Sequence, residues 1–190
     1  MGYKMKKYIT GIVAAYFFIF SYALAIPPPI DLGIQNIPQM TPVWCWAAVA
    51  QQIIYRLNPG STPQQCQLVA EAYNANPQIC CNAPASCMAT GSLQQIQHLI
   101  SNYSGHSSTI TPPANPMAIY QTLASGRAII MQVRSSPYSN HVIVIRGMAW
   151  VPTPMGIQPV LYINDPMAYF TQPILFSNLA MYWLAAIVVN

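Results

Sequence analysis

One cysteine of the chain stands apart from the others, at a position that favours a reactive thiolate. Cys45 lies near the start of an apolar stretch, residues 43–57, which predicts a buried helix that ends at Asn58-Pro59-Gly60. Backbone N–H groups at a helix N-terminus carry partial positive charge and favour the thiolate, the nucleophilic form of cysteine. A free cysteine is also a common core residue. Because the other cysteines all lie within residues 66–87, the isolation of Cys45 favours a nucleophile.

A histidine and an acid farther along the chain could activate this thiol. His141 opens a β-branched stretch after a polar loop, which predicts a position at a strand end. Asp165 closes the next predicted strand and could hold one imidazole nitrogen while the other nitrogen faces the thiol. Asn164 competes for this role, since an amide can also orient a histidine. The remaining histidines are less well placed, His98 inside a predicted helix and His106 in a Ser/Gly loop.

An amide donor precedes the candidate nucleophile. Gln39 lies six positions before Cys45, and its side-chain amide could donate to a developing oxyanion beside the Cys45 backbone N–H. Other glutamines lie near the same cysteine in the sequence, namely Gln35, Gln51 and Gln52. Together these residue types predict attack of a thiolate on a carbonyl carbon.

The pattern Gln39-x5-Cys45-Trp46-Ala47-Ala48 resembles that of papain-like cysteine peptidases, which carry a glutamine six positions before a Cys-Trp helix start. The chain also contains WCWAA, the strand HVIVIRG preceded by GRAIIMQV, and INDP at the end of the next predicted strand. In these features it is most similar to the compact branch typified by the AvrRpt2 effector peptidases. The bacteriocin-leader peptidases are a more distant relative. The resemblance covers roughly residues 36–166. It implies a papain-like fold, with Cys45 as nucleophile, His141 as base, Asp165 as orienting acid and Gln39 as oxyanion donor.

Two features depart from papain itself. His141 follows Cys45 by 96 residues, whereas about 130–150 residues separate the two in papain. The approach to the nucleophile is Pro42-Val43-Trp44, without the Cys-Gly-Ser-like residues of papain. We expect Trp44 to make the entrance to the site bulkier and to change the substrate preference.

The clustered cysteines predict two disulfides. Cys66, Cys80, Cys81 and Cys87 allow three pairings, and a bridge between the adjacent Cys80 and Cys81 would close a strained ring. The remaining pairings join Cys66 to either Cys80 or Cys81, and Cys87 to the other. Four thiolates could also hold zinc, but this spacing differs from that of paired zinc knuckles.

The order of the predicted elements indicates an α+β fold. Further helices are predicted from Ser61 or Thr62 to about Tyr73, over residues 92–102, and from Asn115-Pro116 to Ser125-Gly126. Thr62 with Gln65 forms a capping-box pattern at the first of these. Residues 74–90 are predicted to be a loop. Antiparallel strands are then expected over residues 128–134, 141–149, 159–163 and 185–189. Helices first and antiparallel strands second predict a helical half that bears Cys45 and a sheet half.

The N-terminus has the pattern of an export signal. A basic start with three lysines precedes the apolar run Ile9–Phe20, and Ala23-Leu24-Ala25 supplies a small-x-small cleavage pattern. We therefore predict a signal peptide over residues 1–25, a single peptidase domain over residues 26–190, and a secreted or periplasmic location.

Removing the signal changes the charge of the working protein. The whole chain has a formal net charge of +4, but residues 26–190 keep four arginines and three acids, a net charge of +1. Residues 26–190 contain no cluster of basic residues in the sequence, so a nucleic-acid partner is not expected. The apolar stretch Leu179–Val189 is shorter than the roughly 20 residues of a bilayer-spanning helix, so we expect a buried strand and no membrane insertion after signal removal.

The leading hypothesis is hydrolysis of peptide bonds in a protein or peptide substrate, without a metal or organic cofactor. A cell-wall peptidase or amidase, or an acyl transferase, could use the same Cys–His pair. The third hypothesis is a non-enzymatic effector or toxin module that keeps the fold. The presence of Cys45, His141, Asp165 and Gln39 together favours an enzyme.

Overall fold

The computed structural model describes residues 26–168 and 172–190. The predicted signal peptide, residues 1–25, lies outside the described residues. The element order is helical first and β-rich second, and every strand pair is antiparallel, so the predicted α+β class is confirmed. Within the described ranges no helix is both long and apolar enough to cross a bilayer.

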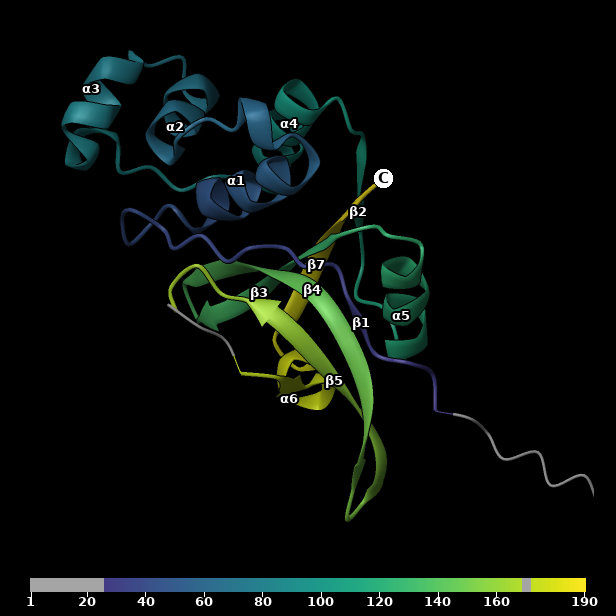
Figure 1. The fold of residues 1–190 in the computed structure, drawn as a ribbon. Coiled ribbons are helices and arrows are strands. Elements are labelled where there is room, and N and C mark those ends of the chain that lie inside the picture. Colours follow the sequence, from purple (N-terminus) through teal and green to yellow (C-terminus); the bar gives the residue numbers. More distant parts are fainter. Residues whose placement is uncertain (1–25, 169–171) are drawn as a thin grey trace, which may run out of the picture.

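The helical half packs on one side of the sheet (Figure 1). Its elements are α1 (Cys45–Leu57), η1 (Pro59–Ser61), α2 (Gln65–Ala72), α3 (Pro77–Asn82), η2 (Pro84–Cys87) and α4 (Leu93–Ser104). As predicted, α1 is a central helix: most of its residues are buried, and it ends at Leu57 with Asn58 as its C-cap. Helix α4 begins with a capping box formed by Ser92 and Gln95, and it ends at Gly105 in the left-handed conformation that glycine adopts without steric cost.

Two local predictions in this half are wrong. Helix α2 starts at Gln65, because Thr62 has an extended backbone and its hydroxyl donates to the carbonyl of Asn58. The capping box is formed instead by Gln64 and Gln67. The predicted loop over residues 74–90 contains α3 and η2. The α3 helix forms because the Asn76 side chain accepts from the N–H of Gln78 and a proline occupies the first helical turn.

The sheet carries the second half of the chain. It has seven strands in the order β2-β7-β3-β4-β5-β6, and β1 pairs with β4 from outside this path. The strands are β1 (Ile30–Asp31), β2 (Ser108–Thr111), β3 (Ile129–Ser136), β4 (Ser139–Thr153), β5 (Gly156–Asn164), β6 (Ile174–Leu175) and β7 (Trp183–Val189). Helices α5 (Pro116–Ala124) and α6 (Phe176–Ala180) accompany them. The long β4–β5 hairpin projects away from the helical half (Figure 1).

Both faces of the sheet are covered by apolar side chains. Alternate residues of a strand point to opposite faces, so Ile130 packs in the core with α1 and α4, whereas its neighbours Ile129 and Met131 pack in a second core with α5. The predicted final strand is β7, which lies inside the sheet between β2 and β3. The sheet is thus a rigid support for the ends of β4 and β5, where His141 and Asp165 lie.

Buried side-chain amides hold the extended segment of residues 26–41, which we call the N-terminal arm, against the rest of the molecule. Gln52 donates to the carbonyl of Ile37 at 3.0 Å, and Gln65 donates to the carbonyl of Pro38 at 2.8 Å. Asn164, at the end of β5, donates to the carbonyl of Ile34 at 2.8 Å. The arm runs between α1 and the sheet (Figure 1), and these bonds fix the segment that carries Gln39.

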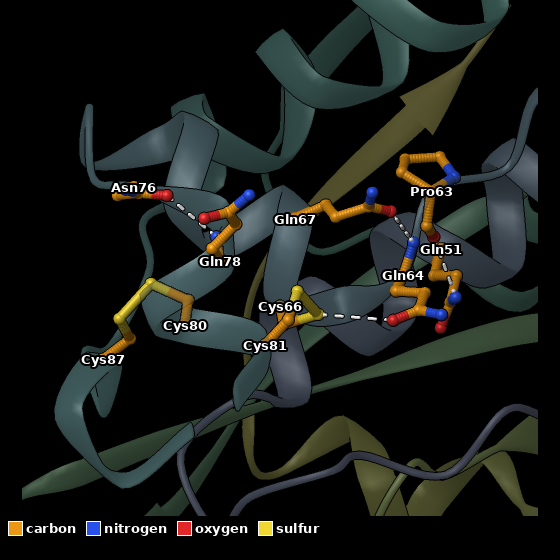
Figure 2. Close-up of a disulfide and its surroundings, with 10 residues drawn as sticks. All are labelled: Gln51, Pro63, Gln64, Cys66, Gln67, Asn76, Gln78, Cys80, Cys81 and Cys87. Carbon is orange, nitrogen blue, oxygen red and sulfur yellow. Dashed lines mark hydrogen bonds between the residues drawn. A yellow bond between two sulfur atoms is a disulfide. The ribbon is translucent and has the colours of Figure 1, made fainter. Parts of the chain in front are cut away.

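The two disulfides join Cys66 to Cys81 and Cys80 to Cys87 (Figure 2). This is one of the two pairings that the sequence leaves open, and it excludes a zinc site made of these four sulfurs. The first bridge ties α2 to α3, and the second ties α3 to the end of η2. Cys45 is the free cysteine of the described residues.

We expect Cys45 to be the one cysteine that iodoacetamide labels rapidly in the native protein, because the other sulfurs are oxidised. Peptide mapping after alkylation at mildly acidic pH measures this. Reduction should raise the intact mass by four hydrogens and allow all five cysteines to be labelled, which is the control. Even labelling before reduction would contradict the pairing.

Candidate active site

A cleft of about 610 Å³ opens between the start of α1 and the adjoining ends of β3 and β4. It contains both Cys45 and His141 in its lining. The other lining residues come from the approach to α1, the segment after the second disulfide, the β3–β4 turn and the segment after β5: Pro42, Val43, Trp46, Thr90, Gly91, Gln132, Ser135, Tyr138, Ser139, Asn140, Val142 and Met167. The structure therefore brings together a helix-start cysteine and a strand-end histidine that are 96 residues apart.

Cys45 is the first residue of α1, and its side chain is half-buried. Among the described residues no side chain caps this helix start, so its backbone N–H groups can face a negative charge. The free sulfur thus lies at the positive end of the helix dipole.

The tryptophans beside Cys45 anchor the helix start to the disulfide-bearing segment. The indole N–H of Trp44 donates to the carbonyl of Cys87 at 3.1 Å, and that of Trp46 donates to the carbonyl of Ala89 at 3.1 Å. A side chain at Gly91 would collide with the Trp46 ring, at 2.1 Å from its Cβ position. The expectation that Trp44 narrows the entrance is wrong, because its side chain is fully buried and Trp46 lines the cleft.

His141 is held by a carboxylate from the neighbouring strand end. Its Nε2 atom lies 2.7 Å from Oδ1 of Asp165, and the imidazole side chain is 11% exposed. Asp165 follows the last residue of β5, which pairs with β4. Because Nε2 is engaged by the carboxylate, Nδ1 is the nitrogen left for the thiol.

The surroundings favour the charged form of the imidazole. Burial alone would lower the pKa of His141, but the hydrogen bond with Asp165 and the interaction with Cys45 raise it from 6.5 to about 9. Burial alone would raise the pKa of Asp165, but its hydrogen bonds with His141 and with the N–H of Met167 lower it below the usual value. At neutral pH, His141 is therefore an imidazolium and Asp165 a carboxylate.

The Asn164 side chain forms its hydrogen bonds away from His141. Its side chain is buried and donates to the Ile34 carbonyl and, at 3.2 Å, to Oε1 of Gln52. Because these bonds hold the N-terminal arm against β5, the amide serves the packing of the arm. Of the two candidates for the third residue, Asp165 is the one in contact with His141.

We expect Asp165→Ala and Asn164→Ala to have opposite phenotypes. Asp165→Ala should lower kcat for peptide hydrolysis by more than about tenfold, since His141 loses its orienting partner. Asn164→Ala should retain most of kcat but lower stability by about 1–3 kcal/mol, because buried polar partners are left unpaired. Steady-state kinetics and thermal unfolding of both variants check this. If Asn164→Ala is the more damaging to kcat, the amide is the orienting residue.

Gln39 lies beside the cleft and is not part of its lining. It lines an adjoining hollow, where its Nε2 atom donates to the carbonyl of Thr41 at 2.7 Å. One of the two amide hydrogens on Nε2 is used in this bond, and the other is left for a further acceptor. Its Oε1 atom is buried and has no hydrogen-bond partner among the described residues. The oxyanion role of Gln39 stays a prediction.

The comparisons with known proteins identify a family and a fold. The sequence profile of the Peptidase C39 like family matches residues 31–186, which is most of the chain. The chain belongs to the Peptidase C39 like family. A crystal structure from Bacillus anthracis, described as that of a candidate C39-like peptidase, matches with a TM-score of 0.58 at 10% sequence identity. The match covers 86% of this chain and 98% of that chain. No curated protein matches the sequence.

For this C39-like chain the papain-like α+β fold is confirmed. The more specific similarity to the AvrRpt2 branch stays a prediction, because the family that matches is the C39-like one. Within the described residues, no group of three or more His, Cys, Asp or Glu side chains is arranged to hold a metal ion.

Sequence reasoning missed several residues that line the cleft of this C39-like protein. Thr90 ends the predicted loop and Gly91 directly follows it, Tyr138 lies in the loop before His141, and Met167 lies just after the INDP run. Each lies within a few residues of a bridged cysteine or of a site residue. Proximity in sequence to those residues is the signal that could have identified them.

Proposed function

We propose that this C39-like chain is an exported cysteine peptidase that hydrolyses peptide bonds. In this proposal Cys45 is the nucleophile, His141 the acid and base, Asp165 the residue that orients His141, and Gln39 an oxyanion donor. The observation that carries the proposal is the cleft that contains a free cysteine at a helix start and a carboxylate-held histidine. Membership in a peptidase family supports the same chemistry.

The first half of the reaction would form an acyl-enzyme. The Cys45 thiolate attacks the carbonyl carbon of the scissile bond, and a C–S bond forms as the carbonyl oxygen becomes an oxyanion. The Cys45 backbone N–H and the Gln39 amide would stabilise that charge. When the C–N bond breaks, the imidazolium of His141 gives its proton to the departing amine.

The second half would release the acid product. The neutral imidazole of His141 takes a proton from water, and the resulting hydroxide attacks the thioester carbon. The C–S bond then breaks and restores the thiolate and the imidazolium. Asp165 keeps the ring in position through both halves, because its carboxylate stays bound to Nε2.

Export is part of the proposal for two reasons. The first residues have the composition of a signal peptide, and two disulfides are typical of an oxidising compartment outside the cytoplasm. We therefore propose a secreted or periplasmic location.

Cleavage-site profiling tests the proposal. The purified protein and its Cys45→Ala variant are incubated with a mixture of folded and denatured proteins, and new N-termini are identified by mass spectrometry. We expect new termini with the wild type and none with Cys45→Ala. Absence of cleavage that depends on Cys45, together with turnover of purified cell wall, would support an amidase instead and overturn the peptidase proposal.

The raised pKa of His141 predicts the pH dependence. The imidazolium persists up to about pH 9, so kcat/KM should fall as the pH rises through that value, because the acid for the leaving amine is lost. In Asp165→Asn the decline of kcat/KM should move to lower pH, because this variant lacks the carboxylate that raises the pKa of His141. A pH profile of kcat/KM for both proteins measures this. An unmoved decline would show that Asp165 does not control the ionisation of His141.

The free energy of unfolding should also depend on the ionisation of His141. The pKa of His141 is about 9 in the folded protein and 6.5 as its ordinary value, so between these values the folded state binds more protons than the unfolded state. The contribution of His141 is fully present below about pH 6.5 and is lost as the pH rises through 9.

A further inference from the structure

A second hollow adjoins the cleft on the side of the N-terminal arm. It has a volume of about 320 Å³ and is lined by Pro38, Gln39, Met40, Thr41, Pro42, Pro166, Met167 and Ala168. Pro42 and Met167 line both the hollow and the cleft, so the hollow and the cleft that contains Cys45 adjoin at these two residues. We call this second hollow the methionine groove.

The groove exposes apolar side chains that the fold does not cover. Met40 is 54% exposed and Met167 is 66% exposed. Among the residues that the structure describes, no lysine, arginine, aspartate or glutamate lines the groove or the cleft. Methionine is flexible and polarisable, so a pair of them can adapt to apolar side chains of different shape.

The backbone beneath these methionines is firmly held. The N–H of Met40 donates to Oε1 of the buried Gln65 at 2.8 Å. The N–H of Gln39 donates to the carbonyl of Pro166 at 2.9 Å and so joins the two walls of the groove. A preformed apolar depression with a fixed backbone is the usual form of a side-chain pocket in a binding cleft.

One carboxylate oxygen connects this groove to the candidate catalytic histidine. Oδ1 of Asp165 lies 2.7 Å from His141 Nε2 and accepts from the N–H of Met167 at 2.9 Å. His141 must face the departing amine of the substrate in order to protonate it. Nδ1, the nitrogen that Asp165 does not bind, gives that proton, so the amine lies on the imidazole side of Cys45. The chain beyond the amine would then continue past His141 toward Met167, which lines both the cleft and the groove.

We infer that the methionine groove binds an uncharged apolar side chain of the substrate, within the first two residues on the leaving-amine side of the scissile bond. The inference rests on the proposed peptidase function and adds the substrate class: peptides with an apolar residue just after the cleaved bond. Met40 and Met167 are then residues that determine specificity.

A charge introduced into the groove tests this inference. The wild type, Met167→Glu and Met40→Glu are compared on peptide libraries in which the residues on either side of the scissile bond are varied one at a time. The control is Met155→Glu at the tip of the β4–β5 hairpin, where the methionine is 82% exposed and lines neither hollow.

We expect the wild type and Met155→Glu to prefer apolar over charged residues on the leaving side by more than about tenfold in kcat/KM. Met167→Glu and Met40→Glu should shift the preference toward Lys and Arg at the same position by about tenfold, because an opposite charge in a partly dehydrated groove is attractive. The preference on the acyl side should stay unchanged.

Two results would overturn the inference. Identical leaving-side profiles in Met167→Glu and Met155→Glu would show that the groove does not contact the substrate, and a change confined to the acyl side would show that the chain direction is reversed. Failure of the proposed function is distinguishable, because the wild type would then give no cleavage that Cys45→Ala removes, and the inference would fall with it.

Discussion

We expect His141→Ala to lower kcat/KM for peptide hydrolysis by about 10⁴-fold or more. The imidazole has two tasks in the proposed mechanism, protonation of the leaving amine and activation of water. Among the described residues, the only other titratable side chains that line the cleft are Cys45 and Tyr138. Losses of this size are typical when one member of a catalytic unit is removed. Steady-state kinetics on a peptide found by cleavage-site profiling measures the effect.

The other histidines supply matched controls for this variant. His98 contacts Asn102 on α4, and Nδ1 of His106 lies 2.6 Å from the carbonyl oxygen of Asn190, so neither lies in the cleft. His98→Ala and His106→Ala should keep their activity within about threefold of the wild type. Thermal unfolding of all three variants separates lost chemistry from lost folding. If kcat/KM of a folded His141→Ala protein falls by less than tenfold, His141 is not the base.

The second large effect concerns Gln39. We expect Gln39→Ala to lower kcat by about 10²–10³-fold with little change in KM, because an oxyanion donor acts mainly in the transition state. The amide must direct its second hydrogen toward the substrate, since its first is bound to the carbonyl of Thr41. A kinetic comparison at saturating and at low substrate concentration separates kcat from KM.

Gln35 offers a matched control on the same arm, because it is exposed and lines neither the cleft nor the methionine groove. Gln35→Ala should leave both kinetic constants unchanged. Gln39→Ala also removes a hydrogen bond to the backbone, so thermal unfolding must accompany the kinetics. If kcat is unchanged in a folded Gln39→Ala protein, the oxyanion is stabilised by other donors.

Local patterns were enough to predict the elements that carry the site. The apolar run after Cys45 predicts α1, and the β-branched runs around His141 and before Asp165 predict β4 and β5. A strand that is covered on both faces is a continuous apolar run, and such a run is visible in the sequence. Capping was less predictable. The hydroxyl of Thr62 could bond forward or backward, and in the structure it bonds to the preceding turn.

The sequence by itself determined the chemical inventory: a lone cysteine at a helix start, a histidine and an acid at strand ends, and four clustered cysteines with two acceptable pairings. Only the tertiary structure decided which of these groups meet. It pairs Cys66 with Cys81, and it buries Trp44, whose indole N–H donates to the carbonyl of Cys87. It also directs Asn164 to the N-terminal arm, while Asp165 contacts His141. The reason is physical: a periodicity or a cap depends on residues a few positions apart, whereas contacts between distant residues depend on how whole helices and strands pack.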